Sequence, residues 1–259
     1  MPETSEQSAT EGLPVVLRTA FAEGEVYSSA GAKIPLDSNV SPEEAFTLYT
    51  AVREIKPAVS AEVGFAKGVS TLSILQGLED NHQGSHHVID PFQRDYGYAG
   101  LEMAKRAGTD SRLTFYETFP ENVIPGLPRL QFAFIDASHL YDLTLMEFVL
   151  LDKKLDVGGL IGLHDMWMPS LQKALRYILS NRSYRLYPPS GQELAPSVKP
   201  GFKRVIKHRA AALLAKLPRS EKIFSPELLR PWSRMQIPNL VLLEKTGEDN
   251  RDWRFHEHF

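Results

Sequence analysis

Three acidic residues stand where apolar segments of this sequence end. Glu62 precedes a glycine-containing turn, Asp90 follows Val88-Ile89, and Asp136 follows Phe134-Ile135. If these apolar segments are parallel strands, their carboxyl ends meet at one edge of a sheet, and the three carboxylates surround one crevice. Carboxylates at that place can accept hydrogen bonds from the hydroxyl and amino groups of a ligand, so the pattern indicates a nucleoside-binding crevice.

The turn after Glu62 is suited to close contact with a ligand. Gly64 and Gly68 lie two and six residues beyond Glu62, and Ser70 lies eight beyond it. Glycine permits positive φ and leaves no side chain between the backbone and a ligand. Backbone N–H groups at the start of a following helix would face an anionic or polar group. We therefore predict a strand–turn–helix corner that binds such a group.

Alternating strands and helices are predicted to position these residues. Ser41, Pro42 and Glu44 form a capping-box pattern that begins a helix ending before Pro57. Gly158-Gly159 is expected to break the chain before the fifth strand. The alternation favours an α/β fold: a Rossmann-like, mostly parallel sheet with helices on both faces. The expected strands are 59–63, 86–89, 112–116, 131–135, 160–163, 184–187 and 239–243, and the expected helices are 41–55, 70–78, 98–107, 143–155 and 171–179.

The composition of the 259-residue chain is that of a globular protein, with 42% hydrophobic and 24% charged residues. The absence of cysteine excludes a disulfide scaffold, a cysteine-ligated zinc site and a thiol nucleophile. We expect residues 1–40 to form a disordered acidic tail followed by an arm or lid, and residues 41–259 to form the main domain. No apolar run approaches the ~20 residues of a membrane span, and no signal peptide is apparent, so we expect a cytoplasmic protein.

One segment, residues 188–238, is strongly basic. It holds ten Lys or Arg against three Asp or Glu, a balance of +7, whereas the whole chain has a net charge of −3. Within it, a predicted helix places Lys203, Arg204 and Lys207 opposite an apolar stripe. This basic helical insertion is either a solvated surface element or a lid or docking surface for an anionic substrate, with peripheral membrane contact as a further alternative.

The motif Glu62-x-Gly-x-x-x-Gly-x-Ser70, the acid ending the second strand, and Asp136-x-x-His139 resemble class I S-adenosylmethionine-dependent methyltransferases. The similarity is to the group of macrolide-sugar and aminocoumarin O-methyltransferases and cephalosporin-hydroxylase-like proteins. It extends over about 41–167 and the closing strand. The resemblance implies seven strands with the last antiparallel. It also implies O-methylation of a small hydroxylated acceptor, such as a sugar or glycosylated metabolite.

The resemblance also implies roles for individual residues. Asp90 would bind the ribose hydroxyls, Thr118 and its neighbours would border the adenine, and Asp136 would lie beside the sulfonium. His139 would be the general base, with Asp136 as the second catalytic residue. The turn and its flanks would hold the methionine part of the cofactor through Glu62, Gly64, Phe65, Ala66, Gly68, Ser70 and Thr71.

A divalent metal is also implied, with Asp136 and Asp165 as its ligands. Relatives that use metal usually have Asn or Asp after the second ligand, whereas this chain has Met166, which cannot serve Mg²⁺. His164 precedes Asp165, and strand alternation is expected to point it away. Two carboxylates with waters and substrate oxygens would still hold Mg²⁺.

Other interpretations of the same residues stay open. His139 could only hydrogen-bond its own loop, and Asp136 and Asp165 could be helix N-caps. A nicotinamide-dependent oxidoreductase is disfavoured because the turn lacks Gly-x-Gly-x-x-Gly. A non-catalytic binding module on the same fold is a third alternative. Tyr96, Tyr98, Tyr141, Trp167 and Met168 are candidates for an acceptor pocket. We expect a small-molecule acceptor, no nucleic-acid partner and a homo-oligomer.

Overall fold

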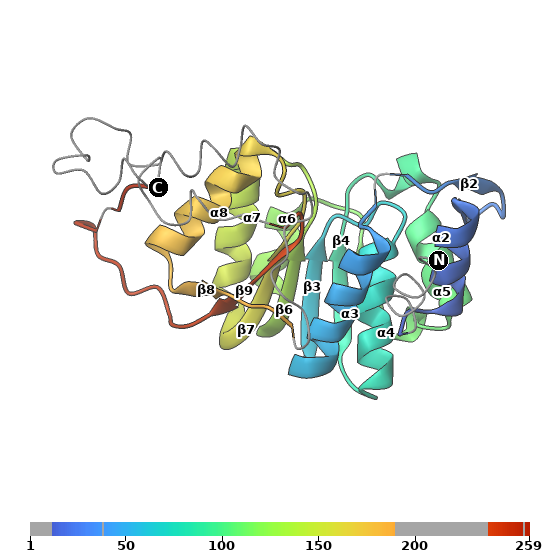
Figure 1. The fold of residues 1–259 in the computed structure, drawn as a ribbon, viewed down its shortest axis with the longest axis horizontal. Coiled ribbons are helices and arrows are strands. Elements are labelled where there is room, and N and C mark those ends of the chain that lie inside the picture. The colour runs from blue at the N-terminus through green and yellow to red at the C-terminus, as the bar shows by residue number, and fades with distance from the viewer. Residues whose placement is uncertain (1–11, 38, 190–237, 256) are drawn as a thin grey trace, which may run out of the picture.

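A seven-stranded sheet forms the centre of the protein in the computed structural model, which describes residues 12–37, 39–189, 238–255 and 257–259 (Figure 1). The strand order is β5-β4-β3-β6-β7-β9-β8, and β9 runs antiparallel to both of its neighbours. The predicted mostly parallel sheet with an antiparallel last strand is therefore confirmed. The strands are β3 (Val59–Val63), β4 (Ser85–Ile89), β5 (Leu113–Tyr116), β6 (Leu130–Ile135), β7 (Leu155–Leu163), β8 (Tyr184–Leu186) and β9 (Val241–Lys245).

Helices cover both faces of this sheet, as Figure 1 shows. Along β6 the side chains alternate: Phe132 and Phe134 pack with α3 and α4, whereas Ala133 and Ile135 pack with α7 and α8. This alternation gives two hydrophobic cores, one on each face. The helices are α3 (Pro42–Ile55), α4 (Val69–Asp80), α5 (Ala99–Ala107), α6 (Pro120–Val123), α7 (Tyr141–Asp152) and α8 (Pro169–Asn181).

The strand register brings the ends of four strands to one edge of the sheet. Val63 pairs with both Ile89 and Ile135, and Ile135 pairs with Leu163. The residues that follow these strands, which include Asp90 and Asp136, therefore leave the sheet side by side. This is the crevice that the sequence pattern predicts.

The N-terminal arm, residues 12–40, consists of α2 (Val15–Glu23) and a hairpin of β1 (Glu25–Tyr27) and β2 (Lys33–Pro35). Leu17, Val26 and Val40 are buried in the same core as α3 and α4. The arm is thus packed onto the sheet domain, with α2 beside α5 (Figure 1). Its end is tied to the glycine turn by an ion pair between Asp37 and Lys67.

The predicted boundary between α7 and β7 is wrong. The helix ends at Asp152 and the strand begins at Leu155, so Gly158-Gly159 lies inside the strand. The pairing of β6 with β7 is irregular there, passing from Leu130↔Leu155 to Phe132↔Leu160. A bulge accommodates the extra residues, and Gly158 adopts the positive φ of 87° that it requires.

The edge strand β8 pairs with β9 in antiparallel orientation, although about 50 residues separate the two strands in the sequence. The pairing continues past β8, because the Tyr187 N–H donates to the Leu242 carbonyl at 2.8 Å. Nearly all of the basic insertion, including Lys203, Arg204 and Lys207, lies outside the described residues. Across the described part of the chain, none of the helices is long and apolar enough to cross a membrane.

Candidate active site

The glycine turn between β3 and α4 can be made only with glycine at two positions. Gly64 has φ of 97°, and a Cβ there would lie 2.0 Å from the Asp136 carbonyl oxygen. Gly68, the N-cap of α4, has φ of 85°, and its Cβ would lie 2.9 Å from the Cα of Gly100. The turn lines a pocket together with Asn39 and Val40 of the arm and with Asp136. The predicted turn residues 64–70 therefore meet Asp136 in one place.

Glu62 is fully buried beneath this turn and binds only protein groups in the described structure. Ser70 donates a hydrogen bond to one carboxylate oxygen. Thr71 Oγ1 donates to the other at 2.6 Å, and His86 Nε2 lies 3.0 Å from that oxygen. His86 is itself buried, with Nδ1 2.9 Å from Ser60 Oγ. Glu62 thus holds the first turn of α4 and positions Ser70, which itself faces the pocket.

Asp90 connects the end of β4 to the same turn. Its Oδ2 accepts hydrogen bonds from the backbone N–H groups of Phe65 and Ala66, both at 3.0 Å, and Oδ1 accepts one from Phe92 at 2.8 Å. Its side chain is buried. The structure therefore places Asp90 beside the turn, where it fixes the backbone of Phe65 and Ala66.

Two exposed aromatic rings lie beyond Asp90. Phe92 and Phe119 are 55% and 51% exposed, and their ring centroids are 6.2 Å apart in an edge-to-face arrangement. Thr118 precedes Phe119, and its Oγ1 accepts a hydrogen bond from Asn122 at 3.2 Å. Sequence reasoning missed Phe92, although a bulky apolar residue directly after Asp90-Pro91 was a usable signal. The pair can provide an apolar surface for a flat base.

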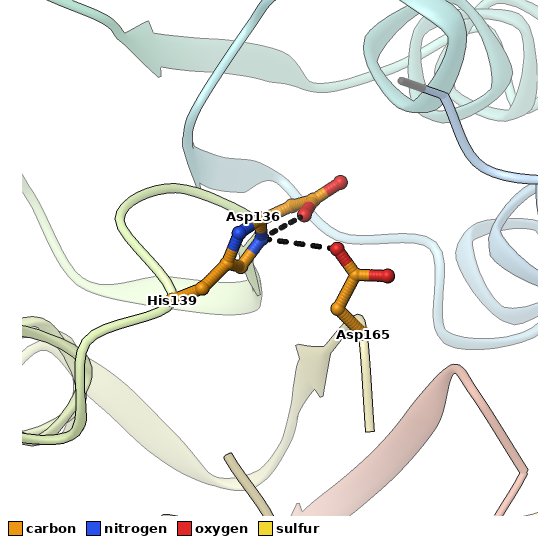
Figure 2. Close-up of side chains that lie close together, drawn as sticks. All are labelled: Asp136, His139 and Asp165. Carbon is orange, nitrogen blue, oxygen red and sulfur yellow. Dashed lines mark hydrogen bonds and ion pairs between the residues drawn. The ribbon is translucent and has the colours of Figure 1, made fainter. Parts of the chain in front are cut away.

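Asp136, His139 and Asp165 converge at the ends of β6 and β7 (Figure 2). His139 Nε2 lies 3.1 Å from Asp136 Oδ1 and 3.2 Å from Asp165 Oδ2. His139 and Asp165 both have positive φ, 57° and 54°, which is uncommon for residues other than glycine. Ser170, in the first turn of α8, donates to the His139 carbonyl at 2.8 Å and holds the loop. The three predicted residues are thus brought together.

His164 is also part of this cluster, contrary to the expectation from strand alternation. Its Nδ1 lies 3.2 Å from Asp136 Oδ2 and 3.7 Å from Asp165 Oδ1. The left-handed conformation of Asp165 turns the chain after β7, so consecutive side chains no longer point to opposite sides. On its other side, His164 Nε2 lies 3.2 Å from Glu44 Oε2 and 3.0 Å from Asn239 Nδ2.

The electrostatics of the cluster keep Asp136 ionised. Burial would raise its pKa, but His139 and His164 outweigh that effect and lower the pKa to about 2. The Asp136 carboxylate in turn raises the pKa of His139 above its usual value, against the effect of burial. Burial would lower the pKa of His164, yet Asp136 and Glu44 raise it to about 10. Two imidazoles therefore flank one carboxylate, Asp136, that is ionised at neutral pH.

Around the cluster, Trp167 is 68% exposed and its Nε1 donates to Asp165 Oδ1 at 2.9 Å. Leu140, next to His139, is also exposed, whereas Met166 is buried. Trp167 and Leu140 offer apolar surface beside the charged groups. Met166 contributes a backbone N–H that donates to the Asn239 carbonyl at 3.0 Å, and its sulfur is not a metal ligand candidate.

Comparisons with known proteins agree with this geometry. Residues 61–166 match the family model of a methyltransferase domain. Among solved structures, the cofactor-bound Rv0187 from MTB matches with a TM-score of 0.57 and 13% identity, covering 89% of this chain and 88% of its own. The O-methyltransferase TomG from Streptomyces achromogenes, in complex with S-adenosylmethionine, has a TM-score of 0.55 and 12% identity, covering 95% and 92%.

The Podospora anserina methyltransferase PaMTH1, solved with S-adenosylhomocysteine, matches with a TM-score of 0.55 and 16% identity, covering 72% of this chain and 92% of its own. A search of curated protein sequences finds no match. The fold is therefore similar to that of methyltransferases solved with S-adenosylmethionine or S-adenosylhomocysteine, and part of the chain matches a methyltransferase domain. The matched domain runs from β3 to the turn after β7, the segment that contains Gly64, Asp136 and Asp165.

Proposed function

We propose that this protein transfers the methyl group of S-adenosylmethionine to a hydroxyl group of a small acceptor, such as a sugar or a glycosylated metabolite. The observation that carries the proposal is His139, which two carboxylates hold beside the glycine turn. A histidine so placed is suited to remove a proton from a hydroxyl group. The O-methyltransferases among the structural neighbours support the same reaction.

The cofactor is assigned to the crevice around the glycine turn. Its methionine part would lie in the pocket formed by residues 64–70 with Asn39 and Val40, at the start of α4, where the Ser70 hydroxyl, which donates to Glu62, can still accept a hydrogen bond. Its ribose would lie near Asp90, and its adenine near Phe92, Thr118 and Phe119. In this arrangement Glu62 and Asp90 act mainly by fixing the turn, because each already accepts several hydrogen bonds.

The reaction is an in-line displacement. The acceptor oxygen forms a bond to the methyl carbon while the bond from that carbon to the sulfonium sulfur breaks, which leaves S-adenosylhomocysteine. His139 presents Nε2 to Asp136 and Asp165, so Nδ1 is the nitrogen left to take the hydroxyl proton. Asp136 holds the ring orientation and stabilises the imidazolium that forms, as a carboxylate does in other acid–histidine pairs.

Any Mg²⁺ at this site would be weakly held, by Asp136 and Asp165. Asp136 and Asp165 provide carboxylate oxygens at neighbouring strand ends, which fit the oxygen preference of that ion. A bound divalent cation would lower the pKa of an acceptor hydroxyl. Full activity in the presence of EDTA would leave Asp136 and Asp165 as groups that position His139.

Calorimetry with S-adenosylhomocysteine tests the cofactor assignment. We expect micromolar binding, about −7 to −8 kcal/mol. Binding of NADH in its place would refute the proposal and favour an oxidoreductase. For the base, we expect His139→Ala to reduce turnover by about 10²–10⁴ with little change in cofactor affinity. An equal loss of cofactor affinity would show that His139 is structural.

The acceptor is proposed to be anionic, because the basic insertion concentrates positive charge on an otherwise acidic chain. Replacing Lys203, Arg204 and Lys207 together by Gln should raise the KM for an anionic acceptor at low salt. The effect should fade as salt shortens the Debye length to about 8 Å at physiological ionic strength. A KM that is unchanged at every salt concentration would assign these cations to a solvated surface.

A further inference from the structure

We infer that Lys67 binds the carboxylate of the cofactor's methionine part, and that this carboxylate takes the place of Asp37 beside the Lys67 ammonium group. The inference rests on the proposed use of S-adenosylmethionine. It assigns a role to a residue that the glycine motif leaves open, because position 67 is one of its variable positions. Three observations carry it: the burial of Lys67, the exposure of Asp37, and the charges around the pocket.

The first observation is that Lys67 is a buried cation. Its side chain is 9% exposed, and among the described residues its Nζ forms one ion pair, with Asp37 Oδ1 at the end of the N-terminal arm. A buried ammonium group that loses its anionic partner strongly destabilises the folded state. Lys67 therefore requires an anion beside it in every state in which the pocket is formed.

The second observation is that the partner of Lys67 lies at the surface. The Asp37 side chain is 66% exposed, so water can solvate its carboxylate when the ion pair opens. An exposed carboxylate loses little free energy on separation from its partner, whereas the buried ammonium group loses much. The pair can therefore open when another carboxylate reaches Lys67, because only Asp37 has water as an alternative partner.

The third observation is the distribution of charge around the pocket. Among the described residues that line it, Lys67 is the one cation and Asp136 the one anion. Ser70, which also lines it, lies in the first turn of α4, where backbone N–H groups lack partners within the helix and favour an anion. The methionine part of the cofactor carries one carboxylate and one ammonium group, so the lining complements both of its charges.

The position of Asp37 agrees with an exchange at this pocket. Asn39 and Val40, which line the pocket, follow Asp37 by two and three residues. Burial raises the pKa of the Tyr96 hydroxyl, and the carboxylates of Asp90, Asp37 and Asp136 raise it further. Asp37 thus acts on the same hydroxyl group as two acids of the crevice, which places the ion pair at the crevice rather than on a remote surface.

The exchange has two consequences for the protein. Lys67 becomes a specificity-determining residue, because a ligand without the carboxylate gains nothing from it. The arm also becomes coupled to cofactor binding, since the cofactor releases Asp37 from the glycine turn. A negative charge at position 37 therefore competes with the cofactor for Lys67, and its removal should favour binding.

Calorimetry of the full chain with two ligands tests the role of Lys67. One ligand is S-adenosylhomocysteine, and the other is its decarboxylated analogue, which keeps the ammonium group. Lys67→Met should weaken S-adenosylhomocysteine binding at least about tenfold and change binding of the analogue by less than about twofold. Lys33→Met is the matched control, because Lys33 pairs with Glu23 and Glu25 on the exposed hairpin of the arm. It should leave both affinities unchanged.

The role of Asp37 is tested by a second substitution. Asp37→Asn should strengthen S-adenosylhomocysteine binding by about two- to fivefold, the range expected for loss of a competing exposed ion pair. Binding of the decarboxylated analogue should not change. In the double variant with Lys67→Met, the effect of Asp37→Asn should disappear, because the two residues act through one ion pair.

Two outcomes would overturn this inference alone. Equal weakening of both ligands by Lys67→Met, or no weakening of either, would show that Lys67 does not bind the carboxylate. Weaker S-adenosylhomocysteine binding in Asp37→Asn would show that the ion pair must stay closed. Absence of S-adenosylhomocysteine binding by the unaltered chain would overturn the proposed function as well. Melting temperatures of the variants show whether each is folded, so a folding defect is separated from a loss of binding.

Discussion

Asp90 shows how a single side chain can organise a binding turn. Because its Oδ2 accepts hydrogen bonds from the N–H groups of Phe65 and Ala66, its removal would release the backbone of the turn as well as the proposed ribose contact. We predict that Asp90→Ala weakens S-adenosylhomocysteine binding at least about tenfold, since charge-assisted hydrogen bonds contribute about 1.5–3 kcal/mol. Calorimetry would measure this, and unchanged affinity would exclude Asp90 from the cofactor site.

Gly64 is a second case at the scale of one residue. A Cβ would meet the Asp136 carbonyl oxygen at 2.0 Å, and the positive φ of 97° adds strain. We expect Gly64→Ala to lower the free energy of unfolding by at least about 2 kcal/mol. Gly126→Ala is the matched control, because no atom lies within 4 Å of its added Cβ. Chemical denaturation of the two variants would compare them, and equal stability would contradict the structure.

At the scale of elements, helix α7 carries a buried acid, Glu147, whose ionised form destabilises the folded state. Glu147 is 3% exposed, Oε2 has no hydrogen-bond partner among the described residues, and burial raises the pKa of Glu147 to about 7. The folded state therefore holds this proton more tightly than the unfolded state. Stability should fall as pH rises from about 4.5 to about 7, by at most about 3 kcal/mol for this group.

The substitution Glu147→Gln removes the free-energy cost of ionising a buried carboxyl group. We expect the variant to exceed the original chain in unfolding free energy at pH 8, by about 1–3 kcal/mol, and to match it near pH 4.5. Urea denaturation at the two pH values would measure the difference. A variant that is less stable at pH 8 would show that the carboxylate is needed in its charged form, and burial would then not be the dominant effect.

The elements themselves were largely predictable, and the reasons differ from one to another. The capping box of Ser41 and Glu44 and the apolar runs before Glu62, Asp90 and Asp136 gave α3 and three strands. These signals are local, so the sequence alone carries them. The start of β7 was not predictable, because a bulge that depends on pairing with β6 absorbs Gly158-Gly159. Tertiary pairing decided that boundary.

The candidate site also combines features that the sequence could indicate with features that depend on tertiary packing. The family resemblance implied that Asp136, His139 and Asp165 belong to one site, and the shared edge of strand ends in a parallel sheet agrees with that. It did not predict His164, since the left-handed conformation of Asp165 overrides strand alternation. Nor could it show that Glu44 would lie beside His164, a pair separated by 120 residues. Long-range contacts of this kind follow only from the packed sheet.

At the scale of the whole molecule, the basic segment begins after β8 and ends before β9, and these two strands are paired with each other. Replacing residues 190–237 by a short glycine-containing linker should leave the fold and cofactor binding intact. Shortening a loop from about 50 to about 5 residues should favour the folded state by about 2 kcal/mol in closure entropy. Methylation of the acceptor should be lost. Melting curves and calorimetry would test this, and loss of cofactor affinity would show that the segment supports the crevice.

The adjacency of β8 and β9 has a consequence for how such an enzyme can diversify. Tyr187 and Leu242 are hydrogen-bonded, so the chain leaves the sheet and returns to it at one place. Because both ends of residues 190–237 join the sheet at adjacent positions, this segment can be replaced or lengthened as a unit. Gly64, Asp90 and Asp136 would keep their positions in such a change. Under the proposed function, a lineage could acquire new acceptors by changing residues 190–237 alone, and a laboratory could graft the corresponding residues of a relative to transfer acceptor preference.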